Sequence, residues 1–139
     1  MKDTELIRLA DAARKNAYAP YSGFTVGAAL LASDGTVTLG CNVENASYGA
    51  TVCAERVAVS RAVADGKRDF AAIAVVGGRQ GKSAETAFSP CGVCRQVLRE
   101  FCRDDFRVLV GNGEEIVCHM LGELLPVGFS SDAMKEIHP

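Results

Sequence analysis

Three cysteines constrain this chain more than any other feature. Cys91 and Cys94 follow Pro90, and if that proline opens a helix, both sulfurs lie on one face of its first turn. Cys53 also lies at an expected helix start, where the helix dipole lowers a thiol pKa and favours the thiolate that a metal needs. Three thiolates form a soft, tetrahedral set that suits Zn²⁺. We therefore expect the two helix starts to converge on one metal site.

The fourth coordination position decides what such a site can do. A structural zinc normally takes four protein ligands, whereas a catalytic zinc keeps one position for water. His119 falls late in a strand pattern and His138 near the end of the chain, so neither is expected to be a ligand. Glu55 lies two residues after Cys53, close enough to exchange protons with a metal-activated water. Although the first turn of any helix favours an acid, we expect one catalytic Zn²⁺ per chain, with Glu55 as the proton shuttle.

Length and charge limit the partners. With 139 residues, 48% of them hydrophobic, the chain can bury one core, and we expect a single domain over residues 1–139. The net charge of -2 comes from 15 basic and 17 acidic residues that are well mixed, so nothing indicates a nucleic-acid partner. No stretch approaches the ~20 apolar residues of a membrane span, and residues 1–5 lack the apolar core of a signal peptide. We expect a cytoplasmic protein with a small, nearly neutral substrate and no membrane partner.

The other three cysteines do not suggest disulfides. Cys41, Cys102 and Cys118 form an odd remainder with no framework spacing. Cys102 lies on the apolar face of a helix pattern and Cys118 in a strand pattern, so we expect both to be buried as small hydrophobic residues.

The first half of the chain predicts a helix, a hairpin and a second helix. Apolar residues at helical spacing indicate a helix from about 3 to 18. Two β-rich runs, 25–31 and 37–43, flank an Asp-Gly turn and predict antiparallel strands. Residues 45–50 are expected to be a loop that leads to the Cys53 helix, which ends near 65–66.

The second half completes an α/β pattern. Residues 70–76 are almost continuously apolar, as in a central strand covered on both faces. Residues 77–83 are expected to be a mobile surface loop without chemistry. A helix over about 91–102 precedes strands at 107–111 and 115–119, whose short Asn-Gly gap requires antiparallel pairing. The predicted fold is a three-layer α/β/α sandwich around a mixed five-stranded sheet.

The cysteine motif resembles that of the zinc nucleoside deaminases, and further segments look like the small, homotetrameric cytidine deaminases. The segments that carry this resemblance are Ala19-Pro20-Tyr21-Ser22, Phe24, Val26-Gly27-Ala28-Ala29-Leu30, Cys41-Asn42-Val43-Glu44-Asn45, Cys53-Ala54-Glu55-Arg56, Pro90-Cys91-Gly92-Val93-Cys94 and Leu124-Leu125-Pro126. They span nearly the whole chain.

The resemblance implies a reaction. It is the hydrolytic deamination of cytidine and 2′-deoxycytidine to uridine and 2′-deoxyuridine plus ammonia, in pyrimidine salvage. Zn²⁺ would be held by Cys53, Cys91 and Cys94, while Glu55 would carry protons from water to N3 of cytosine and to the leaving amine. Arg56, which could otherwise be an ordinary surface residue, would offset the net negative charge of three thiolates on one zinc.

The resemblance also implies the nucleoside contacts. Asn42 and Glu44 alternate in the last part of the second strand, so both would point toward the ribose hydroxyls. Phe24 would pack against the nucleoside, while the backbone N–H of Ala54 and the carbonyl of Ser89 would hold the base and its amino group. Without the resemblance, Phe24 could be a core aromatic residue, and Asn42 and Glu44 could be turn residues.

Phe129 lies in a tail flanked by Gly and Ser, with few apolar residues near it in the sequence. In the similar tetrameric enzymes an aromatic residue at this place packs on the pyrimidine of a neighbouring subunit. We therefore expect a homotetramer with shared active sites, in which Phe129 has this role.

Three alternatives remain open at this point. A blasticidin-type deaminase looks similar around the zinc, but the pair of Asn42 and Glu44 favours a ribose. A non-catalytic zinc-binding module would not need Glu55. A nucleic-acid editing enzyme is disfavoured by the charge balance and by the Asn112-Gly113 hairpin, because by resemblance such enzymes insert a helix there and run the two strands parallel.

Overall fold

The computed structural model describes residues 1–85 and 88–137. Its centre is a five-stranded sheet in the order β2-β1-β3-β4-β5. The strands are β1 (Phe24–Ala32), β2 (Val37–Cys41), β3 (Phe70–Arg79), β4 (Arg107–Gly111) and β5 (Ile116–Met120). β3 and β4 are parallel, whereas the other neighbouring pairs are antiparallel. The sheet is therefore mixed, and β3 is its central strand, as predicted.

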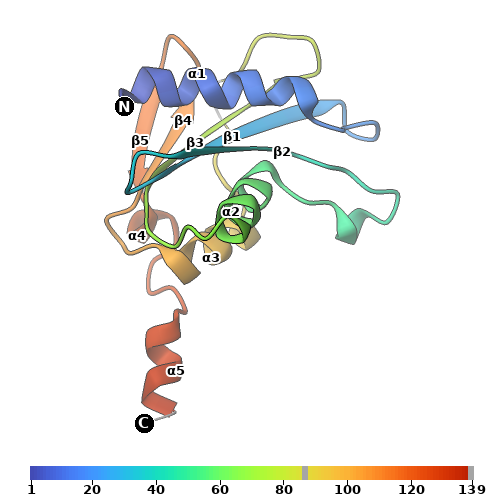
Figure 1. The fold of residues 1–139 in the computed structure, drawn as a ribbon. Helices are drawn as coiled ribbons and strands as arrows, with labels where there is room; N and C mark the ends of the chain where they lie inside the picture. The colour runs from blue at the N-terminus through green and yellow to red at the C-terminus, as the bar shows by residue number, and fades with distance from the viewer. Residues whose placement is uncertain (86–87, 138–139) are drawn as a thin grey trace.

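Helices cover both faces of the sheet (Figure 1). Helix α1 (Asp3–Ala13) lies on one face, whereas α2 (Ala54–Ala64) and α3 (Gly92–Phe101) lie on the other. The short α4 (Leu121–Leu124) follows β5, and α5 (Ser131–Ile137) extends away from the three layers. This arrangement confirms the predicted three-layer α/β/α sandwich. Among the described residues, no helix is long and apolar enough to cross a membrane.

Alternation along β3 explains its nearly continuous apolar sequence. Ile73 and Val75 pack in the core beneath α2 and α3, together with Leu98. Ala74 and Val76 face the opposite way and pack against α1. Because both faces of the strand are buried, neither set of alternating positions can be polar.

Two predicted boundaries near the N-terminus were wrong. The helix predicted over 3–18 leaves the α conformation after Ala13 and continues only as a 3-10 turn, Arg14–Asn16. Tyr18 is then extended, because its N–H donates to the Asn42 carbonyl at 3.0 Å and its own carbonyl accepts from Glu44 N–H at 2.8 Å. The second strand ends at Cys41, two residues earlier than predicted. Long-range pairing of the backbone thus sets both ends.

The loop predicted at 77–83 begins later than expected. β3 continues through Arg79, because its last residues pair with the first residues of β1, with Arg79 opposite Phe24. Residues 77–79 are therefore strand, and only the part from Gln80 onward forms the surface connection.

The last two strands are antiparallel, as the Asn-Gly gap predicted. The Asn112 side chain closes the turn, since its oxygen accepts from Glu114 N–H at 2.8 Å and Glu115 N–H at 2.9 Å. Cys102 is buried as expected, but the expectation that Cys118 is buried was wrong. Cys118 is exposed because β5 is an edge strand whose side chains are covered by little of this chain.

Gly40 permits α2 to reach the sheet. A Cβ atom at this position in β2 would lie 2.3 Å from the Ala54 carbonyl oxygen and 2.6 Å from the Ala58 nitrogen. Both neighbours are backbone atoms of α2, which cannot rotate away as a flexible side chain could. The first turn of α2, which contains Glu55, is therefore seated directly on the backbone of β2.

We predict that Gly40→Ala shifts this turn and lowers the free energy of unfolding by about 1–3 kcal/mol, because the added methyl overpacks the contact. Thermal unfolding of the zinc-loaded protein measures the loss. Gly113→Ala is the control, since no atom lies within 4 Å of a Cβ built there. Equal melting temperatures for the two variants would contradict the prediction.

Candidate metal centre

The structure brings the three motif cysteines together. Cys53 is the N-cap residue of α2, Cys91 is the N-cap residue of α3, and Cys94 lies in the first turn of α3. The Cys53 and Cys91 sulfurs are 4.0 Å apart, and those of Cys91 and Cys94 are 3.4 Å apart. All three sulfurs lie within 4.8 Å of one another.

This geometry fits a tetrahedral zinc. Zn–S bonds of ~2.3 Å place neighbouring sulfurs of a tetrahedron ~3.8 Å apart, a value between the two measured spacings. Within residues 1–85 and 88–137, no other three His, Cys, Asp or Glu side chains form such a group. His119 lies half-buried on β5, and His138 is outside the described residues. The described ligand set is therefore three thiols, which leaves one position open.

Glu55 lies beside these sulfurs in the first turn of α2. Only 4% of it is exposed. Burial raises the pKa of its carboxyl group and the charge of Cys53 adds to that shift, while hydrogen bonds from its own backbone N–H and then from Cys94 partly oppose it. A carboxyl group in this environment keeps a proton at a pH at which an exposed glutamate has lost it. Glu55 can therefore both accept and donate a proton beside the thiols.

Arg56 brings a positive charge to the cluster. Its Nη2 donates to the Thr51 carbonyl at 3.1 Å and lies 3.7 Å from the Cys53 sulfur. Hydrogen bonds from Cys94 and then Arg56 lower the pKa of the Cys53 thiol against the opposing effect of burial. The Arg56 Nε is buried and has no hydrogen-bond partner among the described residues. The sequence motif indicated Arg56, but nothing in the sequence indicated the Thr51 contact.

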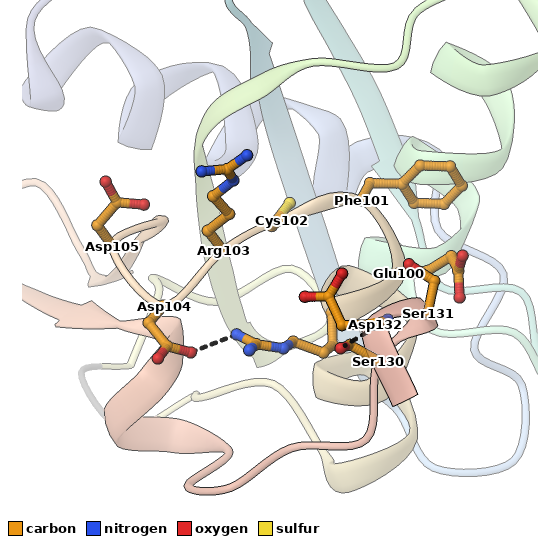
Figure 2. A pocket seen from close by; sticks show the side chains of 10 residues that line it. Glu100, Phe101, Cys102, Arg103, Asp104, Asp105, Ser130, Ser131 and Asp132 are labelled. Atoms are coloured by element: carbon orange, nitrogen blue, oxygen red, sulfur yellow. Dashed lines mark hydrogen bonds and ion pairs between the residues drawn. The ribbon is translucent and has the colours of Figure 1, made fainter. Parts of the chain in front are cut away.

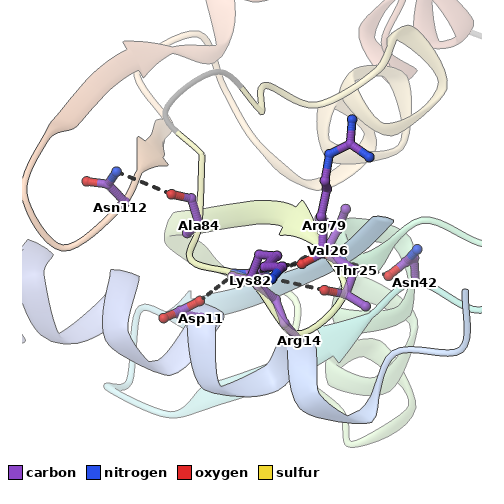
Figure 3. Close-up of polar contacts among 9 residues, drawn as sticks. All are labelled: Asp11, Arg14, Thr25, Val26, Asn42, Arg79, Lys82, Ala84 and Asn112. Carbon is purple, nitrogen blue, oxygen red and sulfur yellow. Dashed lines mark hydrogen bonds and ion pairs between the residues drawn. The ribbon is translucent and has the colours of Figure 1, made fainter. Parts of the chain in front are cut away.

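Asn42 lies against the beginning of β1. Its side-chain oxygen accepts from Val26 N–H at 2.8 Å (Figure 3). Its Nδ2 donates to the Phe24 carbonyl at 2.9 Å. One amide hydrogen and one lone pair remain beyond these two bonds. Asn42 therefore fixes the backbone next to Phe24 and can still donate one hydrogen bond and accept one.

Glu44 points toward the same segment. Its carboxylate accepts from the backbone N–H groups of Tyr21 and Ser22, at 2.9 and 3.1 Å, and from the Ser22 hydroxyl. The Ser22 hydroxyl is the largest cause of the lowered pKa of Glu44, which therefore stays ionised. A hollow of about 360 Å³ adjoins it, lined by Tyr21, Ser22, Glu44, Tyr48 and Thr51. The resemblance included Ser22, but sequence reasoning gave it no role.

A buried arginine, Arg14, binds the backbone beside Phe24 and opposite it. The Arg14 Nε donates to the Thr25 carbonyl at 3.0 Å, and its Nη2 donates to the Arg79 carbonyl at 3.2 Å (Figure 3). The Arg79 guanidinium in turn lies 5.3 Å from the Phe24 ring centroid. Sequence reasoning missed Arg14. Its position four residues after the buried Ala10 was the available signal.

The remaining predicted contacts lie at the start of α2, before α3 and in the tail. Ala54 is the first residue of α2, where backbone N–H groups lack intrahelical partners. Ser89 is exposed immediately before Pro90. Phe129 is 61% exposed, so its own chain leaves most of the ring uncovered.

A larger hollow, of about 650 Å³, lies at the far end of α3 (Figure 2). It contains none of the motif cysteines. Arg99 and Asp104 pair within it, and burial raises the pKa of the Cys102 thiol to about 12, which leaves that sulfur unreactive. This hollow therefore presents no catalytic group like those at the thiol cluster.

Comparison with known proteins agrees with this geometry. The model of the cytidine and deoxycytidylate deaminase zinc-binding region matches residues 1–110. The chain is 47% identical over 132 residues to the cytidine deaminase of Halalkalibacterium halodurans, covering 94% of this chain and 96% of that relative. The chain belongs to the cytidine and deoxycytidylate deaminase family. The resemblance that the motifs carried is thereby confirmed, as is the expected zinc-binding enzyme class.

Solved structures agree with the fold. The crystal structure of cytidine deaminase from Burkholderia pseudomallei superposes with a TM-score of 0.83 at 48% identity, over 93% of this chain and all of that chain. The blasticidin-S deaminase of Bacillus cereus is only 31% identical, over 76% of each chain. The comparisons therefore favour the cytidine deaminases over the blasticidin-type alternative.

We predict one Zn²⁺ per chain, lost when a ligand is removed. Cys91→Ala leaves two thiols, too few to keep the metal through dialysis against a weak chelator. Metal analysis by mass spectrometry measures the stoichiometry. Cys118→Ala is the matched control, because this exposed thiol lies on β5 and outside the cluster. Retention of a full zinc complement by Cys91→Ala would show that Cys91 is not a ligand.

Proposed function

We propose that this chain catalyses the zinc-dependent hydrolytic deamination of cytidine and 2′-deoxycytidine to uridine and 2′-deoxyuridine, with release of ammonia. The observation that carries the proposal is the group of three thiols with an open fourth position, beside a buried Glu55. A non-catalytic zinc-binding module has no need to bury an acid beside its metal, since burial without function costs stability. Glu55 therefore favours an enzyme.

The bound Zn²⁺ would supply a Lewis acid that lowers the pKa of water to about 7. Glu55 supplies the proton transfers. It takes one proton from the attacking water and gives it to N3 of cytosine, then takes the remaining proton from the same oxygen and gives it to the departing amine, so that water and cytidine become uridine and ammonia. Its raised pKa suits this exchange, because the group must hold and release protons near neutral pH.

The nucleoside is proposed to bind beside the segment that leads to Phe24. Asn42 and Glu44 are proposed to bind the ribose hydroxyls, and both already face the segment that leads to Phe24. Phe24 packs against the nucleoside, and the backbone groups of Ala54 and Ser89 hold the base. A charged Glu44 oriented by Ser22 is a preorganised acceptor for hydroxyl groups.

Arg56 balances the charge of the site in this proposal. Three thiolates on one Zn²⁺ carry a net charge of -1, which weakens the metal as a Lewis acid. Donation from the guanidinium to the Cys53 sulfur offsets part of that charge.

The substrate is proposed to be a free nucleoside. The net charge of -2 provides no basic surface for a polynucleotide, and β4 and β5 form an antiparallel hairpin with no helix between them. A single catalytic domain over residues 1–139, acting in pyrimidine salvage in the cytoplasm, completes the proposal.

We also propose a homotetramer whose active sites are shared between subunits. Phe129 presents most of its ring to solvent, and Tyr48 is 75% exposed. Large exposed aromatic side chains near a binding site are typical of surfaces that a partner covers. In the assembled enzyme, Phe129 would pack on the pyrimidine held by a neighbouring subunit.

We predict that the zinc-loaded protein releases ammonia from cytidine and much less from blasticidin S or a cytosine oligonucleotide. Glu55→Gln keeps the metal and the fold but loses the proton shuttle, so turnover falls by ~10²- to 10⁴-fold or more. Ammonia release and metal content are measured on the same samples. Turnover of the variant within about threefold of the unmodified protein would contradict the role of Glu55.

Mixing two nearly inactive variants tests the shared site. Glu55→Gln and Phe129→Ala are co-assembled by denaturing and refolding an equal mixture. If Phe129 acts across an interface, about one quarter of the sites in random mixed tetramers regain both residues, and activity recovers accordingly. Each variant refolded alone is the control. Mixed assembly without recovery, when Phe129→Ala is itself impaired, would contradict the proposal.

A further inference from the structure

Arg95 and Gln96, in the first half of α3, contact two different segments. The Arg95 Nε donates to the Pro90 carbonyl at 2.7 Å, and its Nη1 donates to the Leu124 carbonyl at 2.8 Å. The Gln96 Nε2 donates to the Phe129 carbonyl at 2.9 Å. One helix therefore fastens both the segment that enters the thiol cluster and the tail that carries Phe129.

The first of these segments leads directly into a proposed ligand. Pro90 is fully buried, so its carbonyl needs a hydrogen-bond partner, and the Arg95 guanidinium provides a charge-assisted one. The Arg95 backbone N–H also donates to the Cys91 carbonyl at 3.0 Å, and its Nη2 lies 3.4 Å from the Ser89 hydroxyl. Arg95 thus contacts three successive residues, the last of which bears a metal-binding thiol.

The second segment is a turn fastened at both ends. Arg95 holds Leu124 before the turn, and Gln96 holds Phe129 after it. Between them, Val127 has a φ of +53° and is fully exposed. A β-branched residue disfavours this left-handed conformation, and no packing around its side chain stabilises it. The hydrogen bonds from Arg95 to Leu124 and from Gln96 to Phe129 therefore hold the turn, and Phe129 with it, in place.

We propose that Arg95 is a positioning residue that sets the Ser89–Cys91 segment and the Phe129 tail with one guanidinium, while Gln96 positions the tail alone. The inference rests on the proposed function for the roles of Ser89 and Phe129, but its contacts do not. Arg95 would thereby influence two sites at once, its own through Cys91 and a neighbour's through Phe129.

Removing the Arg95 side chain and removing the Gln96 side chain are expected to have different effects on zinc release and on the Michaelis constant. Without the Arg95 guanidinium, the Pro90 carbonyl loses its hydrogen-bond donor and the Ser89–Cys91 segment becomes more mobile. Zinc is then released to a chelator about tenfold faster or more. The Michaelis constant for cytidine also rises, because the base contact and the tail both move. Without the Gln96 amide only the tail loosens, so the Michaelis constant rises while zinc release keeps its normal rate.

The test compares zinc-loaded Arg95→Gln, Arg95→Lys, Gln96→Ala and the control Glu100→Gln, an exposed residue on the same helix. Zinc release to a chromogenic chelator and amide hydrogen exchange over residues 124–129 are measured without substrate, and kcat and KM with cytidine. Arg95→Lys keeps the charge but replaces the planar guanidinium, whose Nε and Nη1 donate to Pro90 and Leu124, with a single nitrogen on a flexible chain, so its zinc release should also be faster than that of the unmodified protein. If Arg95→Gln fails to fold, the zinc release of Arg95→Lys tests the role of Arg95 instead.

Faster zinc release only in the Arg95 variants, with faster tail exchange in both the Arg95 and Gln96 variants, supports the inference. Normal zinc release and normal tail exchange in a folded Arg95 variant overturn it. Because these two measurements need no substrate, they stand even if cytidine is not deaminated. Absence of activity in the unmodified protein would instead count against the proposed function alone.

Discussion

The meeting of two helix starts on one face of the sheet is the constraint on which the site depends. Two glycines of the sheet lie close to these helix starts or to the segment that leads into them. Gly40 admits the backbone of α2 near Glu55, and a Cβ at Gly77 would lie 2.4 Å from the ring of Phe88, which leads into Pro90. A side chain at Gly40 would overlap backbone atoms of α2, whereas a side chain at Gly77 would have to displace the Phe88 ring. The placement of the sulfurs therefore depends on residues in the strands as well as on the two helices.

The electrostatics follow from that convergence. Three thiols and a buried acid near one point would repel one another when ionised, so the fold must supply positive charge. Two helix N-termini point their positive dipole ends at the cluster, and Arg56 adds a full charge at Cys53. Glu55 differs in this respect, because burial raises the pKa of its carboxyl group while hydrogen bonds from Cys94 and Arg56 lower the pKa of the Cys53 thiol. The proposed proton shuttle and a proposed zinc ligand thus have pKa shifts of opposite direction, although they lie two residues apart.

Local patterns in the sequence were sufficient to predict the sheet, its mixed topology and the cysteine cluster. Periodicity and turn residues identified the strands, and the spacing of Cys91 and Cys94 follows from helix geometry. The features that were not predicted depend on contacts between distant parts of the chain. The extension of β3 to Arg79 depends on pairing with distant Phe24, and the exposure of Cys118 depends on its strand being an edge. Arg14 and Arg95 act through backbone carbonyls, which every residue has, so no side-chain pattern marks their partners.

A division of labour follows from these contacts. The groups that must be rigid for chemistry lie where α2 and α3 meet the sheet, and Glu55 is almost wholly buried there. Several groups proposed to contact the nucleoside, namely Glu44, Ser89 and Phe129, lie in loops or in the tail, and Phe129 is mostly exposed. Deamination needs a closed site, because excluding bulk water strengthens the electrostatic contacts to the base. The core of a chain of 139 residues is taken up by the sheet and its helices, so in the proposed tetramer a second copy would close the site. The hydrogen bonds from α3 to the tail would then link the rigid part of one subunit to the enclosure of the next.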